Sequence, residues 1–191
     1  KLRGRGGMGE VWSCFDLEER RVVAVKVVLA ELVSEPWVRR LFHAEVVAVA
    51  RLSHPGIVDV YDLLQLPDGA SLLVMEYRAG KPLDRAFRSG RTWGDARQVL
   101  VQLLDALAHA HARAVLHLDL KPPNVLVERV PKIVTTLVDF GIARILRPGR
   151  GVETWFEDGS TMGTPEYMSP EQAMGDVARL GPWSDLFSIG V

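Results

Sequence analysis

The chain has 191 residues, of which 48% are apolar and 25% are charged, and its 23 Lys and Arg against 24 Asp and Glu give a formal net charge of −1. This length allows one large domain or two small lobes, and the near balance of charge argues against bulk nucleic-acid binding. The single cysteine, Cys14, excludes an internal disulfide and fits a reducing compartment.

The ends of the chain suggest a piece of a longer polypeptide, because it does not begin with Met and it stops inside the apolar run 188–191. The most apolar stretch, residues 22–32, contains Lys26 and Glu31 and is too short to cross a bilayer. We find no secretory signal within these residues. In a piece of a longer polypeptide, however, the absence of targeting signals means little. We expect a cytoplasmic location and no membrane contact within this segment, although the full-length protein could be anchored to a membrane.

Three glycines near the start, Gly4, Gly6 and Gly9, have the spacing G-x-G-x-x-G. In a dinucleotide-binding turn this motif opens a helix whose N-terminus holds the phosphate. Here residues 10–15 alternate as a strand does, which favours a glycine hairpin between two strands that folds over nucleotide phosphates. Glycine suits such a loop because backbone amides approach a phosphate closely only where no Cβ intervenes. The dinucleotide-binding alternative is the less favoured one.

Lys26 lies in the middle of the β-branched run 21–30, which predicts a strand with Lys26 on the same face as Ala24 and Val28. The functional interpretation places this lysine under the glycine hairpin, and the alternative is a lysine on an exposed strand face. Residues 36–52 predict a helix with Glu45 in its apolar middle, where a carboxylate is costly to bury unless it is paired. We expect Lys26 to be its partner, and solvent exposure is the alternative for Glu45.

Residues 57–66 and 71–77 predict two further strands, joined by a turn at 67–69. Five strands and one helix would then form a small first lobe, and residues 78–82 predict a linker. A ligand cleft is expected at such a junction, where backbone groups near Glu76 and Tyr77 would face a flat heterocycle.

Beyond the linker the periodicity is helical. We expect a short helix over 83–87 and a long one from an N-cap at Thr92 to about residue 112. The predicted apolar face of the long helix consists of Val99, Leu100, Leu103, Leu104 and Leu107. His109 and His111 diverge on a helix and form a poor metal pair, so we expect His111 near the core and His109 exposed.

The segment 115–127 organises the rest of the chain. Two short predicted strands, 115–116 and 125–127, flank a loop in which Pro122 and Pro123 argue against a helix. The polar residues of this loop are His117, Asp119, Lys121 and Asn124. A carboxylate, an ammonium and a carboxamide on one rigid loop are the set that phosphoryl transfer needs. An ordinary polar surface loop is the alternative, but the H-x-D-L-x-x-x-N spacing is fairly specific.

Asp139, which opens an Asp-Phe-Gly triplet, follows a predicted strand over 133–138. Its carboxylate could reach a Mg²⁺ ion, with the Asn124 amide as the second protein oxygen. Residues 142–162 predict a mobile loop whose hydroxyl residues are potential phosphorylation sites or merely solvated: Thr154, Ser160 and Thr161. Residues 183–191 begin another apolar helix.

Taken together, these motifs resemble those of a eukaryotic-type protein serine/threonine kinase, most like the bacterial members. The resemblance covers essentially the whole chain in the family's order, through the runs GRGGMGEV, VAVK, HLDLKPPN, DFG and GTPEYMSPEQA. It implies an α+β, bilobal kinase-like fold. Residues 1–77 would form an N-lobe with a five-stranded antiparallel sheet and one helix, and residues 78–191 a mainly α-helical C-lobe that lacks its last helices.

The resemblance also implies ATP, Mg²⁺ and a protein substrate with a Ser or Thr hydroxyl. Gly4, Gly6 and Gly9 would cover the phosphates, and Lys26 would contact the α- and β-phosphates and pair with Glu45. The adenine site would consist of Val11, Ala24 and Leu126 around the ring, Met75 as gatekeeper, and Glu76 and Tyr77 in a hinge that ends at Arg78.

In the catalytic loop, the resemblance implies that Asp119 accepts the substrate proton and that Lys121 stabilises the transferred phosphate. Asn124 and Asp139 would bind Mg²⁺, and Asp185 would brace the loop from below. Lys121, with Thr164 in the docking segment, is typical of serine/threonine rather than tyrosine kinases.

Three departures from the family pattern matter. Leu118 replaces the usual Arg, which pairs with a phosphorylated activation-loop residue, so we expect activity without phosphate on Ser160. Ser169 replaces Ala in the A-P-E motif, a mild change. Glu171 pairs in the family with an Arg from the part that this chain lacks, so we expect an unpaired carboxylate and a marginally stable fragment.

Two other functions compete with a kinase. A pseudokinase or inactive fragment could act as a nucleotide-binding or interaction module, but Lys26, Asp119 and Asp139 are all present. A nicotinamide-binding oxidoreductase is disfavoured by the strand after Gly9. No nucleic-acid partner is expected.

Overall fold

The computed structural model of the chain describes residues 1–6, 9–28, 43, 46–67, 69–88, 92–129, 131–140 and 165–191. The chain divides into two compact units, residues 1–53 with 57–79 and residues 54–56 with 80–191. Each unit is described by itself below. The described part of the chain contains no helix long and apolar enough to cross a membrane.

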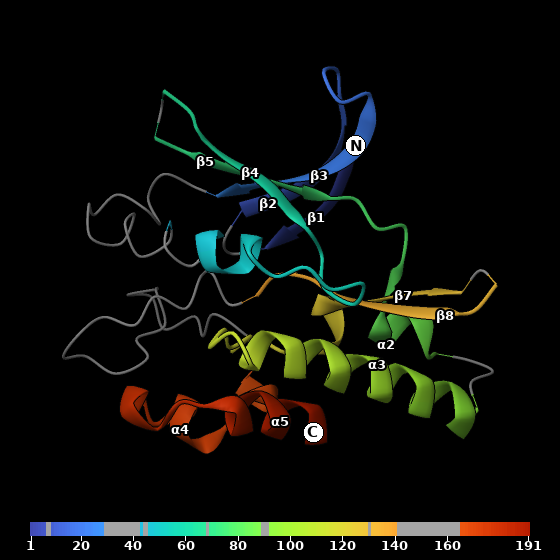
Figure 1. The fold of residues 1–191 in the computed structure, drawn as a ribbon, viewed down its shortest axis with the longest axis vertical. Coiled ribbons are helices and arrows are strands. Elements are labelled where there is room, and N and C mark those ends of the chain that lie inside the picture. Colours follow the sequence, from blue (N-terminus) through green and yellow to red (C-terminus); the bar gives the residue numbers. More distant parts are fainter. Residues whose placement is uncertain are drawn as a thin grey trace. The chain divides into compact units, whose positions relative to one another are not determined.

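The first unit is built on a five-stranded antiparallel sheet with the strand order β1-β2-β3-β5-β4 (Figure 1). Its strands are β1 (Leu2–Gly6), β2 (Gly9–Asp16), β3 (Arg21–Val28), β4 (Val60–Gln65) and β5 (Ser71–Glu76). The β-branched run of β3 occupies the centre, where such side chains pack well on a pleated surface. The predicted strands are confirmed, with β4 beginning three residues later than expected.

Part of the predicted helix of this unit is described. Residues 46–50 are helical, and Val46, Val49 and Leu52 are buried, as the apolar spacing indicates. Glu45 lies outside the described residues, so its expected pairing with Lys26 stays a prediction.

The second unit combines four helices with a three-stranded sheet of order β6-β7-β8 among its described residues (Figure 1). The strands are β6 (Lys81–Pro82), β7 (Val125–Arg129) and β8 (Ile133–Leu137), and the helices are α2 (Leu83–Ala86), α3 (Trp93–His111), α4 (Pro170–Ala173) and α5 (Pro182–Gly190). Short 3₁₀ turns are η2 (Pro122–Asn124), η3 (Pro165–Tyr167) and η4 (Val177–Arg179). Together the two units have the α+β content that the sequence predicts.

Helix α3 begins where the sequence places it. The Thr92 side chain accepts a hydrogen bond from the Asp95 amide and the Asp95 carboxylate accepts one from the Thr92 amide, which is a reciprocal capping box. The residues of its buried stripe are Val99, Leu103, Ala106, Leu107 and Ala110. The predicted apolar face was wrong for Leu100 and Leu104, which are 37% and 39% exposed because they lie one position around the helix from that stripe.

Three other expectations need correction. Residues 115–116 form no strand; the Val115 amide instead donates to the Ala110 carbonyl at the end of α3, at 3.0 Å. Residues 122–124 form a 3₁₀ turn, since proline is tolerated in a first turn. His109 is half-buried rather than exposed: its ring centroid lies 5.0 Å from that of His54, and burial, with Arg113 nearby, lowers its pKa.

Candidate active site

The loop between α3 and β7 brings three predicted functional side chains together, the catalytic Asp119 and Lys121 and the metal ligand Asn124. The Lys121 ammonium lies 3.1 Å from Oδ1 and 2.9 Å from Oδ2 of Asp119. The Asn124 Nδ2 donates to the Asp119 carbonyl at 2.8 Å and to its Oδ2 at 2.9 Å. A carboxylate thus lies between an ammonium and a carboxamide, as the spacing of the motif predicts.

The two prolines explain how Asn124 returns to Asp119. Their fixed φ angles shape the 3₁₀ turn η2, which the Asn124 amide closes by donating to the Lys121 carbonyl at 2.9 Å. Asn124 is buried, so its side chain is held in place by packing as well as by hydrogen bonds.

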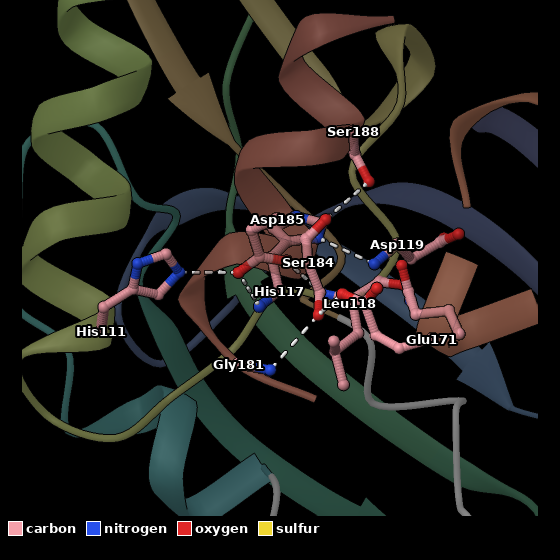
Figure 2. Close-up of polar contacts among 10 residues, drawn as sticks. His111, His117, Leu118, Asp119, Glu171, Gly181, Ser184, Asp185 and Ser188 are labelled. Carbon is pink, nitrogen blue, oxygen red and sulfur yellow. Dashed lines mark hydrogen bonds and ion pairs between the residues drawn. The ribbon is translucent and has the colours of Figure 1, made fainter. Parts of the chain in front are cut away.

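The backbone just before Asp119 is strained. Leu118 has a φ of 56°, a left-handed conformation that is uncommon for a residue with a branched side chain. The buried Asp185 carboxylate of α5 holds this backbone: Oδ1 accepts from the Leu118 amide at 2.8 Å and Oδ2 from the His117 amide at 2.9 Å. Figure 2 shows these groups converging on Asp185. This is the bracing role expected of Asp185.

His111 of α3 completes the shell of donors around Asp185. Its Nε2 lies 2.7 Å from Asp185 Oδ2 (Figure 2), which agrees with the expected near-core position of this histidine. Burial alone would raise the pKa of the Asp185 carboxyl, but the hydrogen bond from His111, the neighbouring His117 and the two backbone amides together lower it. Asp185 is therefore an anion that accepts hydrogen bonds.

His117 links the loop to the end of β8. It is fully buried, and burial outweighs its attraction to Asp185 and lowers the pKa of its imidazole, so the ring is neutral. The Val138 carbonyl, 3.2 Å from Nε2, can only accept, which places the proton on Nε2 and leaves Nδ1 to accept from the Asp119 amide at 3.3 Å. The ring also packs against Phe140, with centroids 4.7 Å apart.

Asp139 directly follows Val138, whose carbonyl bonds to the His117 ring. The Val138 amide donates to the Asn124 carbonyl at 3.0 Å, and Asp139 itself has a φ of 56°. The backbone of Val138, the residue before Asp139, is thus hydrogen-bonded to both ends of the catalytic loop. The described residues hold no group of three His, Cys, Asp or Glu side chains suited to a metal ion.

Two side chains near this loop nevertheless offer oxygen ligands that fit the implied Mg²⁺. Both hydrogen bonds that position Asn124 use Nδ2, so its amide oxygen is the atom suited to a cation. Mg²⁺ is commonly held by one or two protein oxygens together with substrate phosphates and water. Asn124 and Asp139 would supply those oxygens, as their sequence pattern predicts.

Four of the predicted nucleotide-binding residues of the first unit lie on one face of its sheet. Gly6 pairs with Gly9 across the β1–β2 hairpin, Val11 pairs with Lys26, and Ala24 pairs with Met75. Because directly paired residues of antiparallel strands point to the same face, Val11, Ala24, Lys26 and Met75 share one side.

Gly9 is required where it stands. Its φ is 134°, and a Cβ there would lie 1.8 Å from the Val27 carbonyl oxygen. At Gly4, by contrast, an added Cβ would meet nothing within 4 Å. The hairpin thus depends on glycine at Gly9 for close backbone approach, which is one reason for the spacing seen in the sequence.

The predicted hinge lies at the end of β5. Glu76 and Arg78 form an ion pair at 2.9 Å, and the Arg3 guanidinium lies 5.0 Å from the centre of the Tyr77 ring. Leu126 belongs to β7 of the second unit, where it pairs with Pro82. The convergence of the nucleotide-binding residues of the first unit with Asp119, Asn124 and Asp139 of the second stays a prediction.

Glu171 differs from the expectation. Its Oε1 accepts a hydrogen bond from the Ser184 hydroxyl at 2.5 Å, and this bond is the main reason that the pKa of its carboxyl is lowered. The carboxylate thus has a hydrogen-bond partner in Ser184, and its expected lack of an Arg partner stays a prediction. The predicted marginal stability likewise stays a prediction.

Sequence reasoning missed Gln172, whose side chain reaches the catalytic loop from α4. A glutamine after Ser-Pro-Glu carries no chemical signal of its own, and Leu118 lies 54 positions away in the chain.

Comparison with known proteins gives one consistent result. The family model described as "Protein kinase domain" matches residues 1–191. The chain is 40% identical over 197 aligned positions to the serine/threonine-protein kinase pkn3 of Myxococcus xanthus, with all of this chain and 35% of that protein covered. It is 39% identical to the serine/threonine-protein kinase PknA of Mycobacterium tuberculosis, with 100% and 44% covered.

Solved structures agree. The PknI kinase domain of Mycobacterium tuberculosis matches with a TM-score of 0.75 and 25% identity over 99% of this chain and 68% of that one. The chain spans 35% of the length of pkn3 and 44% of the length of PknA, the two curated relatives named above.

Proposed function

This chain belongs to the protein kinase family, and we propose that the protein transfers the γ-phosphoryl group of Mg·ATP to serine and threonine hydroxyls of proteins. The observation that carries the proposal is the arrangement of Lys121, Asn124 and Asp119 on a loop braced by Asp185. The named bacterial relatives are serine/threonine-protein kinases, which supports this substrate class.

The transfer divides into simple roles. The substrate hydroxyl oxygen forms a bond to the γ-phosphorus while the bond from that phosphorus to the β–γ bridging oxygen breaks, and ADP leaves with the electron pair. Asp119 orients the hydroxyl and takes its proton, because a carboxylate oxygen can accept one. The Lys121 ammonium, which lies within 3.1 Å of that carboxylate, stabilises the negative charge of the phosphoryl group during its transfer.

A Mg²⁺ ion bound by Asn124 and Asp139 would neutralise phosphate charge. From the first unit, the backbone of the Gly4–Gly9 hairpin would cover the phosphates, and Lys26 with Glu45 would hold them. The face that carries Val11, Ala24 and Met75 would receive the adenine, against Leu126 on the other side and Glu76 and Tyr77 at the hinge.

Leu118, the residue before the proposed base Asp119, bears on how the activity is regulated. Leu118 is apolar and its backbone is held by an internal carboxylate, so no phosphate is needed to anchor the loop. We infer that a Ser160→Ala variant stays active. A dead Ser160→Ala variant that Ser160→Asp restores would contradict this inference.

Two measurements test the function. Mg·ATP should raise the melting temperature of the protein, because a ligand that binds only the folded state stabilises it. Transfer of labelled γ-phosphate to a generic basic protein should then depend on Mg²⁺ and be lost in Asp119→Asn. A thermal shift without any transfer by the intact protein would instead indicate a nucleotide-binding module.

A further inference from the structure

Gln172 is a buried polar residue with a defined set of partners. It lies in α4 and is 2% exposed. Its Oε1 accepts a hydrogen bond from the Ser169 backbone amide at 3.2 Å, and its own backbone amide donates to the Ser169 hydroxyl at 3.4 Å, which forms a capping box. Its Nε2 donates to the Leu118 carbonyl at 2.8 Å. The last bond leaves the helix and reaches the catalytic loop.

The Leu118 carbonyl belongs to the peptide group that joins Leu118 to Asp119. The Leu118 amide is bound by Asp185 at 2.8 Å, and the carbonyl is bound by Gln172. The left-handed Leu118 backbone is therefore hydrogen-bonded to a residue of α5 through its amide and to a residue of α4 through its carbonyl. Since this conformation is unfavourable for leucine, it persists only because these contacts hold it.

We propose that Gln172 is a positioning residue whose amide sets the plane of the Leu118–Asp119 peptide and thereby the place of the Asp119 carboxylate. The proposal rests on the function proposed above, in which Asp119 is the base. It identifies a direct tie between the segment 165–174 and the catalytic loop, and this tie is made of neutral groups. It needs neither a cation at position 118 nor a phosphate.

A purely structural role for Gln172 makes a different prediction. If the residue only stabilised α4, its loss would lower the melting temperature and leave the turnover of the folded enzyme unchanged. A positioning role instead lowers kcat while the apparent KM for ATP stays the same, because the nucleotide contacts are not altered.

The chain offers a matched control. Gln102 of α3 makes the same pair of bonds, with Nε2 donating to the Ile133 carbonyl at 3.0 Å and Oε1 accepting from the Thr135 amide at 2.9 Å. Its partners belong to β8 rather than to the catalytic loop. Changing either glutamine to glutamate keeps an acceptor oxygen and removes the donor to a backbone carbonyl.

The experiment compares Gln172→Glu and Gln102→Glu in the intact protein. We expect kcat to fall roughly 10- to 100-fold in Gln172→Glu, as small displacements of a catalytic group do, with the KM for ATP within about twofold. Gln102→Glu should keep kcat within about twofold. Gln172→Met, uncharged and of similar shape, should repeat the loss of kcat. Unchanged kcat in folded Gln172 variants, or equal losses in both glutamates, would overturn the proposal.

A spectroscopic readout separates this proposal from the function on which it rests. In Gln172→Glu the backbone amide resonances of Leu118 and Asp119 should shift, and in Gln102→Glu they should not. If the wild-type protein transfers no phosphate but these resonances shift as expected, the kinase function fails and the tie stands. If the Gln172 variants do not fold, the wild-type Gln172 side-chain amide decides: it should show a scalar coupling across the hydrogen bond to the Leu118 carbonyl, and absence of that coupling refutes the tie.

Discussion

Asp185→Asn tests how the catalytic loop is held. Aspartate accepts three hydrogen bonds here, from His111 and the His117 amide on Oδ2 and from the Leu118 amide on Oδ1. Asparagine has one acceptor oxygen. If that oxygen keeps the bonds of Oδ2, its NH₂ group faces the Leu118 amide, so two donors oppose each other.

The expected cost follows from these contacts. One charge-assisted hydrogen bond is broken, a backbone donor is left without an acceptor, and the two remaining bonds become neutral. Such losses add up to about 3–5 kcal/mol in the free energy of unfolding, a large part of the ~5–15 kcal/mol of a typical domain. The released Leu118 backbone should relax from its φ of 56°, and kcat should fall about 100-fold.

Asp105→Asn is the matched control. Asp105 also accepts a hydrogen bond from a histidine, His54, at 3.1 Å, but its side chain is 74% exposed. Its loss should cost about 1 kcal/mol or less. Urea unfolding followed by tryptophan fluorescence measures both variants. An Asp185→Asn protein that unfolds within about 1 kcal/mol of wild type, with full kcat, would refute the reasoning.

The remaining predictions concern the hairpin, the buried histidine and the loop cation. Gly9→Ala should cost about 2–4 kcal/mol, because its φ of 134° and the Val27 carbonyl exclude a Cβ, whereas Gly4→Ala should stay within about 0.5 kcal/mol in the same denaturant titration. Burial lowers the folded pKa of His117 below its ordinary 6.5, so the unfolded chain binds the extra proton first and stability falls as the pH drops below 6.5, by up to about 1.4 kcal/mol per pH unit. His117→Gln, which keeps a neutral donor, should flatten that slope, and an unchanged slope would count against the assignment. Lys121→Met should lower kcat about 100-fold in the phosphate-transfer assay, with the melting temperature nearly unchanged; normal turnover would exclude its role.

Much of the fold follows from local chemistry that the sequence displays. The capping residue Thr92 marks the start of α3, and the β-branched run of β3 marks a central strand, because capping and strand preference depend on neighbours a few residues away. The grouping of Asp119, Lys121 and Asn124 is similarly local, since two prolines fold one short loop.

The tertiary structure decided what depends on distant partners. The left-handed backbone of Leu118 is held by Asp185, far along the chain, which accepts hydrogen bonds from the His117 and Leu118 amides. The bond from Gln172 to the Leu118 carbonyl and the covering of His109 by His54 have the same origin. No local preference encodes them, because such contacts exist only once helices and loops from separate parts of the sequence pack together.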